Sequence, residues 1–570
     1  MSHKLIDKMR RRLADEDGLQ PPPWGGRLSV ALVYPNTYHH AMSNLGFLSV
    51  YQILNSRSDT RCERFFLPDA DDLQEHEKTG YPLFSLESGR FLEDFDLIAF
   101  SISFENDYLN LPRLFELGRL PLWAAERDDQ YPLVLCGGVC AFLNPEPLAE
   151  IMDLFAVGEA EVILPELLAH LGRFDGNRDE LLESLPSLPG IYVPSQYQVD
   201  YHEDGRIAGY SGGAPVQRQW LADLDASVCR SFVQTRETEF GDMSLVEISR
   251  GCSRGCRFCA AGYLFLPPRE RSFDKLVPQL QEGLEQRKRV GLVSPAVSDH
   301  PDIGRLQGWI LEQGGEVAVA SLRIDSLTAQ EVESLKASGH RTVAIAPEAG
   351  SQRLRNVINK GLNEEQILDA VTLIAGGGIL NLKLYFLIGL PSETEADIDE
   401  LLELTSRIRH QWLDAQKPLG RLGNLTLSIN PFVPKPSTPF QWSAMETEKV
   451  LEKRIRKIRS AIARLPNTDV IFESLRSAVL QAFLSRGDRR TARVLPLLSS
   501  GKKLPAACRE TGLDPAFYVF RQREETEVLP WEILDSGVRR EYLWREYQKA
   551  LNEQLTPPCH PHCHRCGICL

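Results

Sequence analysis

The sequence predicts a multidomain α/β protein: an open sheet, then a parallel barrel or partial barrel, then a helical region with a cysteine-rich tail. Three observations predict this order. Short apolar runs alternate with helical patterns up to about residue 170. A second alternating series, with six candidate strands, begins at residue 243. Beyond about residue 445 the strands stop and the pattern is helical.

The chain of 570 residues is too long for one ordinary core, so we expect several segments. Their predicted boundaries are 1–25 for an N-terminal extension, 26–189 for the open-sheet domain, 190–240 for a linker with a β-hairpin, 241–445 for the barrel, 446–555 for the helical module and 556–570 for the tail.

The first series contains four apolar runs with the length and β-branched content of buried strands. These runs are 28–34, 96–102, 132–136 and 153–157. The third is followed by Gly137 and Gly138. Ligands of open α/β sheets bind at the carboxyl ends of strands, where these glycines would let a cofactor approach the backbone.

The second series predicts six strands that alternate with helices, the arrangement of a barrel or partial barrel. They are expected at 243–249, 290–294, 316–320, 341–346, 382–388 and 424–429. The clearest helix is 364–375, which Asn363 can cap. In the linker, we expect strands at 191–193 and 197–201 and a turn at Asp204-Gly205.

The composition is that of a soluble globular protein, with 43% hydrophobic and 25% charged residues. No run of eighteen apolar residues is present, and the polar N-terminus lacks the apolar segment of a secretory signal. We therefore expect a cytoplasmic protein without membrane contact. The net charge of −14 argues against a general nucleic-acid coat. Residues 446–570, however, contain 22 Lys and Arg against 16 Asp and Glu.

Seven of the twelve cysteines lie in two clusters, which in a reducing compartment indicates metal binding. The first cluster is Cys252, Cys256 and Cys259, and the second is Cys559, Cys563, Cys566 and Cys569. The other five are scattered, and we expect each to be a small buried hydrophobic residue. They are Cys62, Cys136, Cys140, Cys229 and Cys508.

The first cluster stands in the motif SRGCSRGCRFCAAG, directly after the first barrel strand. Iron–sulfur clusters usually take four cysteines, so three on one loop would leave one iron open to another ligand. A zinc loop with a distant fourth ligand is the alternative. The position at the carboxyl end of a barrel strand, where barrel active sites form, argues against zinc.

Residues 243–442 resemble the radical S-adenosylmethionine (SAM) core of the cobalamin-domain radical SAM proteins. The matching stretches are LVEISRGCSRGCRFCAAG, LVSPAVSDHPD, ASLRIDSL, IAPEAGSQRLRNVINKG, LKLYFLIGLPSET and INPFVPKPSTPFQW. The resemblance implies that Cys252, Cys256 and Cys259 hold a four-iron four-sulfur (4Fe-4S) cluster, which binds SAM and cleaves it reductively to a 5′-deoxyadenosyl radical. It also implies an electron donor such as flavodoxin or ferredoxin.

The same resemblance implies cofactor contacts for seven further residues. Phe258 would lie beside the adenine, Glu348 would hold the ribose, and Ser298 and Asp299 would contact the methionyl end. Arg323 and Lys360 could pair with the SAM carboxylate, and Lys383 would point into the barrel. The alternatives are an ordinary acidic cap for Glu348 and surface charges for Arg323 and Lys360.

Residues 28–170 are similar to the cobalamin-binding domain that precedes this core. LCGGVCAFLNPEP followed by VGEAE resembles its distal strand and glycine-rich loop. The sequence departs from domains that supply a histidine to the cobalt, because Asp-x-His-x-x-Gly is replaced by YPNTYHHAMSNLG. Cobalt would then lack that ligand, unless His39 or His40 substitutes for it. A domain that keeps the fold without cobalamin is the other interpretation.

The tail PPCHPHCHRCGICL could hold zinc or a second iron–sulfur cluster, and a disordered tail without metal is the alternative. The basic run 453–464 could lie on an RNA backbone. It also fits a helix that buries Ile455, Ile458 and Ile462 and exposes its charges to water.

Three functional hypotheses follow. The first is a radical SAM enzyme, with cobalamin-dependent methyl transfer as one form of it. The second is radical SAM methylation or methylthiolation of RNA or a ribosomal component, with the tail as an auxiliary centre. The third is a non-catalytic metal-bound interaction protein, which predicts no turnover of SAM. Motifs of this kind identify how the radical is made and do not specify the substrate.

Overall fold

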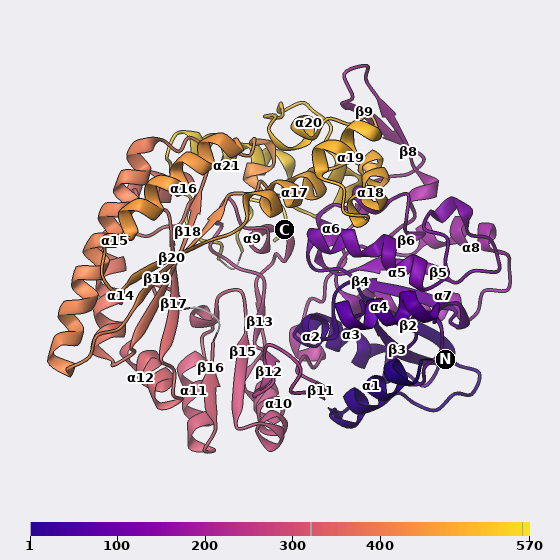
Figure 1. Ribbon diagram of the computed structural model, residues 1–570, viewed down its shortest axis with the longest axis horizontal. Helices are drawn as coiled ribbons and strands as arrows, with labels where there is room; N and C mark the ends of the chain where they lie inside the picture. Colours follow the sequence, from indigo (N-terminus) through magenta and orange to yellow (C-terminus); the bar gives the residue numbers. More distant parts are fainter. Residues whose placement is uncertain (1, 320–321, 561, 570) are drawn as a thin grey trace.

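The computed structural model describes residues 2–319, 322–560 and 562–569. In Figure 1 an N-terminal α/β unit lies beside a second unit of parallel strands and helices, and C-terminal helices extend across one side of both. None of the helices in the described residues is long and apolar enough to cross a bilayer.

The N-terminal unit is built on a six-stranded sheet in the order β3-β2-β4-β5-β6-β7. All neighbouring pairs are parallel except β6 and β7. The strands are β2 Leu28–Tyr34, β3 Thr60–Phe66, β4 Leu97–Ser101, β5 Leu133–Gly137, β6 Leu154–Ala156 and β7 Ile191–Tyr192. The four predicted strands of this sheet are therefore confirmed.

Helices cover both faces of this sheet, because both faces are apolar. Helices α3 (Leu45–Asn55) and α7 (Ala160–Leu171) pack on one face. Helices α5 (Leu111–Leu117) and α6 (Val139–Leu143) pack on the other. The remaining helices of the unit are α1 His3–Ala14, α2 Tyr38–Met42, α4 Ala70–Thr79 and α8 Arg178–Ser184.

The second unit is a partial parallel barrel made of two sheets, β12-β15-β16 and β17-β18-β19-β20. A parallel bridge between Leu322 and Ile345 links them. The strands are β12 Met243–Glu247, β15 Arg289–Val293, β16 Glu316–Ala318, β17 Thr342–Glu348, β18 Asn381–Ile388, β19 Leu425–Pro431 and β20 Thr468–Phe472. All six predicted strands are present, and residue 320, the end of predicted strand 316–320, lies outside the described residues.

Helices line the outside of this barrel in alternation with the strands. They are α10 Phe273–Gln286, α11 Ile303–Glu312, α12 Ala329–Ala337, α13 Gln352–Val357, α14 Glu364–Gly376 and α15 Glu395–Gln416. The predicted cap of α14 is confirmed, since the Asn363 side chain accepts a hydrogen bond from the Gln366 backbone N–H.

Two expectations, on where the strands end and on how the linker strands pair, were wrong. Strands do not stop at residue 445, because β20 extends the barrel sheet beyond β19. It lies at the sheet edge with Asp469 and Ile471 exposed, and its sequence TDVIF has only three apolar residues in a row, fewer than β17 and β18. The expected strands at 191–193 and 197–201 and the turn at Asp204-Gly205 are present, but the two strands do not pair around that turn: β7 pairs with β6 of the N-terminal sheet, and the hairpin pairs β8 (Gln198–Tyr201) with β9 (Ile207–Ser211).

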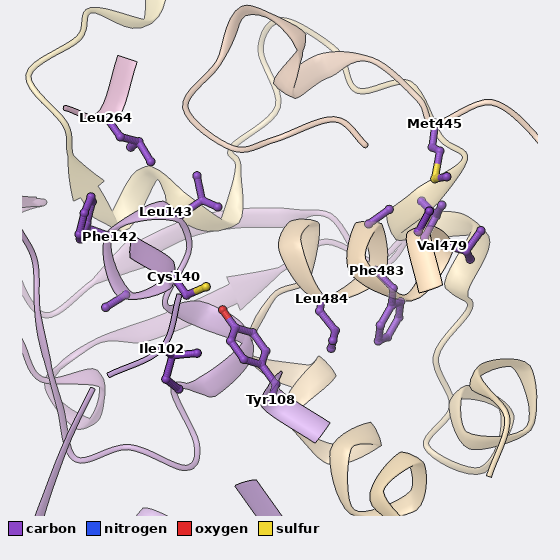
Figure 2. Close-up of a cluster of buried hydrophobic side chains, with 14 of the residues drawn as sticks. Ile102, Tyr108, Cys140, Phe142, Leu143, Leu264, Met445, Val479, Phe483 and Leu484 are labelled. Atoms are coloured by element: carbon purple, nitrogen blue, oxygen red, sulfur yellow. The ribbon is translucent and has the colours of Figure 1, made fainter. Parts of the chain in front are cut away.

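The C-terminal helices pack against the N-terminal unit and the barrel together. The helices are α16 Glu448–Ile462, α17 Leu475–Arg486, α18 Leu495–Ser499, α19 Leu504–Glu510, α20 Pro515–Val519 and α21 Arg540–Leu551. In Figure 2, Phe483 and Leu484 of α17 lie near Tyr108 and Cys140 of the N-terminal unit. This shared core fixes the two α/β units relative to each other.

Helix α16 contains the basic run, and its predicted buried stripe of Ile455, Ile458 and Ile462 is confirmed. Several of its basic side chains pair with carboxylates near or in α15. Arg454 lies 2.7 Å from Glu393, and Lys457 lies 2.6 Å from Asp399. These pairs neutralise part of the charge that RNA would have to contact.

Candidate functional site

The three clustered cysteines lie on one loop between β12 and the short helix α9 (Ala261–Leu264), which we call the cysteine loop (residues 251–260). Two glycines shape its path. Gly251 has φ +84°, and a Cβ there would come within 2.3 Å of the Phe265 carbonyl oxygen. Gly255 has φ +68°. The sequence therefore needs glycine at the start of the loop for the chain to turn away from the strand.

Cys252, Cys256 and Cys259 are partly exposed on this loop, and all twelve cysteines of the chain are free thiols. The Cys259 backbone N–H donates to the Cys256 carbonyl at 3.1 Å, which keeps the last turn tight. In the described part of the chain, no three His, Cys, Asp or Glu side chains are arranged so that they could hold a single metal ion. Three thiols on one turn fit three corners of an iron–sulfur cluster.

Several residues expected to contact SAM face this loop. Burial raises the pKa of the Cys256 thiol. The charges of Lys360 and Arg323 lower this pKa, and that of Glu348 raises it. These three side chains come from different segments of the barrel. The fold therefore brings them to the carboxyl ends of the strands, where barrel active sites form.

Glu348 ends β17 in an unusual backbone conformation. Its φ is +66°, and the strand register shifts between Ile345 and Glu348. Such strain in a residue other than glycine occurs often at functional sites. Lys360 Nζ lies 3.3 Å from Glu348 Oε1. Burial raises the pKa of Glu348 above its ordinary value, although Lys360 opposes the shift.

Asp299 and Arg323 belong to a chain of charges that includes the cysteine loop itself. Arg254 Nη2 lies 2.5 Å from Asp299 Oδ1, and its Nη1 lies 2.7 Å from Asp325. Arg323 lies 2.8 Å from Asp325 and 3.5 Å from Asp299. The buried Ser298 Oγ has no hydrogen-bond partner among the residues described, so it is available to a ligand.

Two further predicted residues lie nearby without polar partners in this group. Phe258 packs against the apolar cluster that contains Tyr263 and Trp442. Lys383 lies on the less buried face of β18, with its Nζ 4.9 Å from the Tyr385 ring centre. The alternation of β18 puts Lys383 opposite the face that packs on the helices, as predicted for a residue directed into the barrel.

A cavity of about 500 Å³ separates the N-terminal unit from the cysteine loop, and we call it the interface cavity. On one side it is lined at the strand ends by Ser101, Gly138 and Gly158. On the other it is lined by Glu247 at the end of β12 and by Gly251. The carboxyl ends of both parallel sheets therefore face the same space.

Of the two predicted glycines, Gly138 lines this space. Gly138 has φ +91°, and a Cβ there would approach the Ile102 carbonyl oxygen to 2.5 Å. Gly137 and Gly138 also line a smaller apolar cavity of about 50 Å³ between the sheet and α3 and α7. Glycine is therefore required at position 138 by its positive φ and by the close approach of the Ile102 backbone.

A network of charged residues that the sequence did not reveal crosses the interface cavity wall. Arg250, beside the cysteine loop, lies 2.7 Å from Glu159 and 2.9 Å from Glu161 of the N-terminal unit. Arg269 lies 2.7 Å from Glu159. Burial opposes ionisation of Glu159, but Arg269 and Arg250 hold the pKa of its carboxyl below the ordinary value. No local signal in VGEAE or SRGC marks this pairing, because only the tertiary structure brings the two segments together.

The tail lies against the cysteine loop. The Cys559 backbone N–H donates to the Ser253 carbonyl at 2.6 Å. Cys563 and Cys566 are buried, and each is 4% exposed. Burial and then the charge of Cys563 raise the pKa of the Cys559 thiol to about 12, with further effects of Cys569 and Cys566. Cys559, Cys563 and Cys566 line one small cavity together.

Arg257, inside the cysteine loop, is another residue that the sequence did not reveal. It is fully buried, and its guanidinium group donates to Glu546 of α21 at 3.0 Å and to the Gln554 carbonyl at 2.7 Å. It also donates to the Val357 carbonyl at 3.0 Å. Arg257 thus joins the cysteine loop to the C-terminal segment that carries the tail.

Comparisons with known proteins match two families. The family described as radical SAM proteins, N-terminal, matches residues 46–194, and the radical SAM superfamily matches residues 246–405. An uncharacterised protein of Methanocaldococcus jannaschii is 28% identical over 488 residues, which are 85% of this chain and 94% of that protein.

A tRNA-2-methylthio-N(6)-dimethylallyladenosine synthase of Ruegeria pomeroyi is 21% identical over 39% of this chain and 51% of its own length. Among solved structures, the radical SAM methyltransferase TsrM of Kitasatospora setae matches with a TM-score of 0.47 and 16% identity, over 73% of this chain and 75% of that one. The cobalamin-dependent radical SAM enzyme OxsB matches with a TM-score of 0.47 and 14% identity, over 92% and 79%.

The radical SAM match includes the cysteine loop, β17 with Glu348, and the strands that support them. The N-terminal match covers most of the sheet whose strand ends face the interface cavity. This chain is a radical SAM enzyme, a member of the superfamily that uses a 4Fe-4S cluster and SAM.

Proposed function

We propose that this chain is a cobalamin-dependent radical SAM enzyme that transfers a methyl group. One observation supports it most directly: the interface cavity lies between the glycine-rich strand ends of the N-terminal sheet and the cysteine loop. A corrinoid there would be held by residues of both units, among them Ser101 and Gly138 on one side and Glu247 and Gly251 on the other. When bound, cobalamin supplies the cobalt centre that carries the methyl group.

In this proposal Cys252, Cys256 and Cys259 hold the cluster. Ser298, Glu348 and Lys360 would contact SAM, since Ser298 Oγ is buried without a partner and the other two form a charged pair beside the loop. The corrinoid would lie at the strand ends of the N-terminal sheet, where Gly138 and Gly158 line the interface cavity.

The residues of the interface cavity support a cobalt without a histidine ligand. The described residues that line it include no histidine. His39 and His40 lie on α2, where His40 is exposed and its Nδ1 lies 2.9 Å from Thr37 Oγ1. This agrees with the absence of the Asp-x-His-x-x-Gly pattern.

Filling the interface cavity tests the cobalamin site. Val50 of α3 is partly exposed and lines this cavity. Val50→Trp should weaken corrinoid binding at least about tenfold, because overpacking of a site typically costs about 1–3 kcal/mol. The measurement is the corrinoid retained per chain, from absorption spectra of anaerobically purified protein with added hydroxocobalamin.

Gln52→Trp is the matched control, because Gln52 lies on the same helix but not among the residues lining this cavity. Its corrinoid content should equal that of the wild type. Wild-type protein without retained corrinoid, or equal retention in the Val50 variant, would contradict the proposed site.

Replacement of Glu348 tests the SAM site. Two hydroxyl groups bound by one carboxylate are worth roughly 2–4 kcal/mol, because charge-assisted hydrogen bonds contribute about 1.5–3 kcal/mol each and are not additive. We therefore expect Glu348→Ala to raise the dissociation constant of SAM at least about tenfold. Equilibrium binding of SAM to the reconstituted protein measures it.

Glu365→Ala is the control, since Glu365 is exposed at the start of α14. A dissociation constant for the Glu348 variant within about twofold of the wild type, less than about 0.4 kcal/mol, would assign Glu348 to an ordinary acidic cap.

Methylthio transfer is a second candidate. It is supported by the position of the tail cysteines beside the cysteine loop and by the similarity to the tRNA-2-methylthio-N(6)-dimethylallyladenosine synthase of Ruegeria pomeroyi. The two candidates differ in their need for cobalamin. Formation of S-adenosylhomocysteine that depends on added cobalamin would favour methyl transfer, and formation without corrinoid would favour methylthio transfer.

A further inference from the structure

The tail and the cysteine loop line one small cavity of about 20 Å³, which we call the tail cavity. Cys252 of the loop lines it together with Cys559, Cys563 and Cys566 of the tail. Two cysteine groups separated by about 300 residues in the sequence therefore face the same space.

The tail repeats the cysteine spacing of the loop. Cys559, Cys563 and Cys566 follow the same Cys-x3-Cys-x2-Cys pattern as Cys252, Cys256 and Cys259. The tail then adds Cys569, again after two intervening residues. A loop with three thiolates leaves one iron of a cubane without a cysteine, whereas four thiolates complete the usual ligand set.

Asn359 and neighbouring groups hold the tail in this position. Asn359 Oδ1 accepts from the Thr556 backbone N–H at 2.8 Å, and its Nδ2 donates to the Gly255 carbonyl at 3.1 Å. One side chain therefore joins the tail to the cysteine loop. Its φ of +54° lies in the left-handed region, which asparagine adopts more readily than most residues.

The tail thiols are also partly enclosed by positive charge. Arg565 Nε lies 3.1 Å from Cys563 Sγ, and its two terminal nitrogens donate to the Pro557 and Pro558 carbonyls. The Arg539 backbone N–H donates to the Cys566 carbonyl at 2.8 Å. Hydrogen bonds to thiolate sulfurs and to the backbone around them are typical of iron–sulfur sites.

We infer that Cys559, Cys563, Cys566 and Cys569 bind a second iron–sulfur cluster with all four irons ligated by cysteine, placed directly against the cysteine loop at Cys252. Full cysteine ligation gives this cluster no open iron for SAM. Because Cys252 lines the tail cavity, the two clusters are close enough for their unpaired spins to interact when both are reduced.

Metal analysis of the full-length holoprotein tests the inference. The wild type should contain about eight irons and eight sulfides per chain after anaerobic reconstitution. The double variant Cys563→Ala, Cys566→Ala should retain about four irons and four sulfides per chain. The triple alanine variant of Cys252, Cys256 and Cys259 should retain the same number. The matched control is His562→Ala, because His562 is an exposed tail residue. This variant should retain about eight irons and eight sulfides per chain.

Electron paramagnetic resonance of the dithionite-reduced protein provides the second readout. The wild type should show a broadened, spin-coupled spectrum that is not the sum of the spectra of the two cysteine variants. The broadening is visible in the wild-type spectrum alone, as lines wider than those of a single reduced 4Fe-4S cluster, so this readout stays valid if the tail variant folds poorly.

One zinc per chain with about four irons would overturn the inference in favour of a structural zinc site. Equal metal in the wild type and the double variant would show that the tail binds no metal. A wild-type spectrum equal to the sum of two independent clusters would overturn their placement beside each other.

Discussion

Replacing Cys252, Cys256 and Cys259 together by alanine should remove the SAM-cleaving cluster and abolish formation of 5′-deoxyadenosine. The loop offers no other thiol or imidazole, and its three cysteines lie on one tight turn. Thiolates are the usual ligands of such clusters, so alanine at all three positions leaves nothing to bind iron there. Iron and sulfide content, together with the absorption of the reconstituted protein, measures the loss.

Ser253→Ala is the control within the same loop, because the interaction that Ser253 makes with the tail uses its backbone carbonyl. It should keep the cluster and the cleavage of SAM. Retention of the same iron, sulfide and cleavage rate by the triple variant would show that other residues hold the cluster.

The second large effect is expected at Arg257. Arg257→Ala should lower the free energy of unfolding by about 3–5 kcal/mol, because removal of one partner leaves a buried ion pair uncompensated. Glu546 keeps Lys549 at 2.9 Å and the Thr556 hydroxyl at 2.8 Å, which favours the lower end of that range. Denaturant-induced unfolding of the metal-free chain, compared with the wild type, measures the change.

Hydrogen exchange separates this role of Arg257 from a general loss of stability. Because its guanidinium group binds the Gln554 carbonyl, the segment 552–560 should exchange faster in Arg257→Ala than the strands of the barrel do. Arg545→Ala is the control, since Arg545 is exposed on the same helix as Glu546 and should change stability by less than about 0.5 kcal/mol. A similar small change for Arg257→Ala would contradict the ion-pair argument.

Local patterns were sufficient to predict most strands, the cap of α14 and the cysteine loop. The inner strands are continuous apolar runs because both faces of a parallel sheet are covered, so their sequence signal is strong. The edge strand β20 was missed for the opposite reason. Thr468 and Asp469 are polar, so only three apolar residues follow one another in this strand.

Long-range pairings of buried charges could not be predicted. Arg257 and Glu546 are separated by 289 residues, and Arg250 and Glu159 by 91. Nothing local distinguishes such residues from the many charged side chains on a surface, and only the fold brings each pair together. The same holds for the tail, whose cysteines are evident in the sequence while their position beside Cys252 is not.

The candidate SAM residues lie between these two cases. Glu348 stands out in the structure by its positive φ and its burial, neither of which is visible in the sequence. For Asp299 and Arg323, the structure adds Arg254 and Asp325 as direct charged partners. Their charges are balanced within the chain, so a ligand at this site would meet a nearly neutral group of side chains.

The central claim is that the cysteine loop makes this chain a SAM-cleaving enzyme. Its most direct test is the amount of 5′-deoxyadenosine formed from SAM by anaerobically reconstituted, dithionite-reduced protein, with the wild type compared to the triple alanine variant of Cys252, Cys256 and Cys259. The account predicts steady formation by the wild type and none by the variant. Equal formation by the two proteins, or none by a wild type that contains its full iron and sulfide, would contradict it.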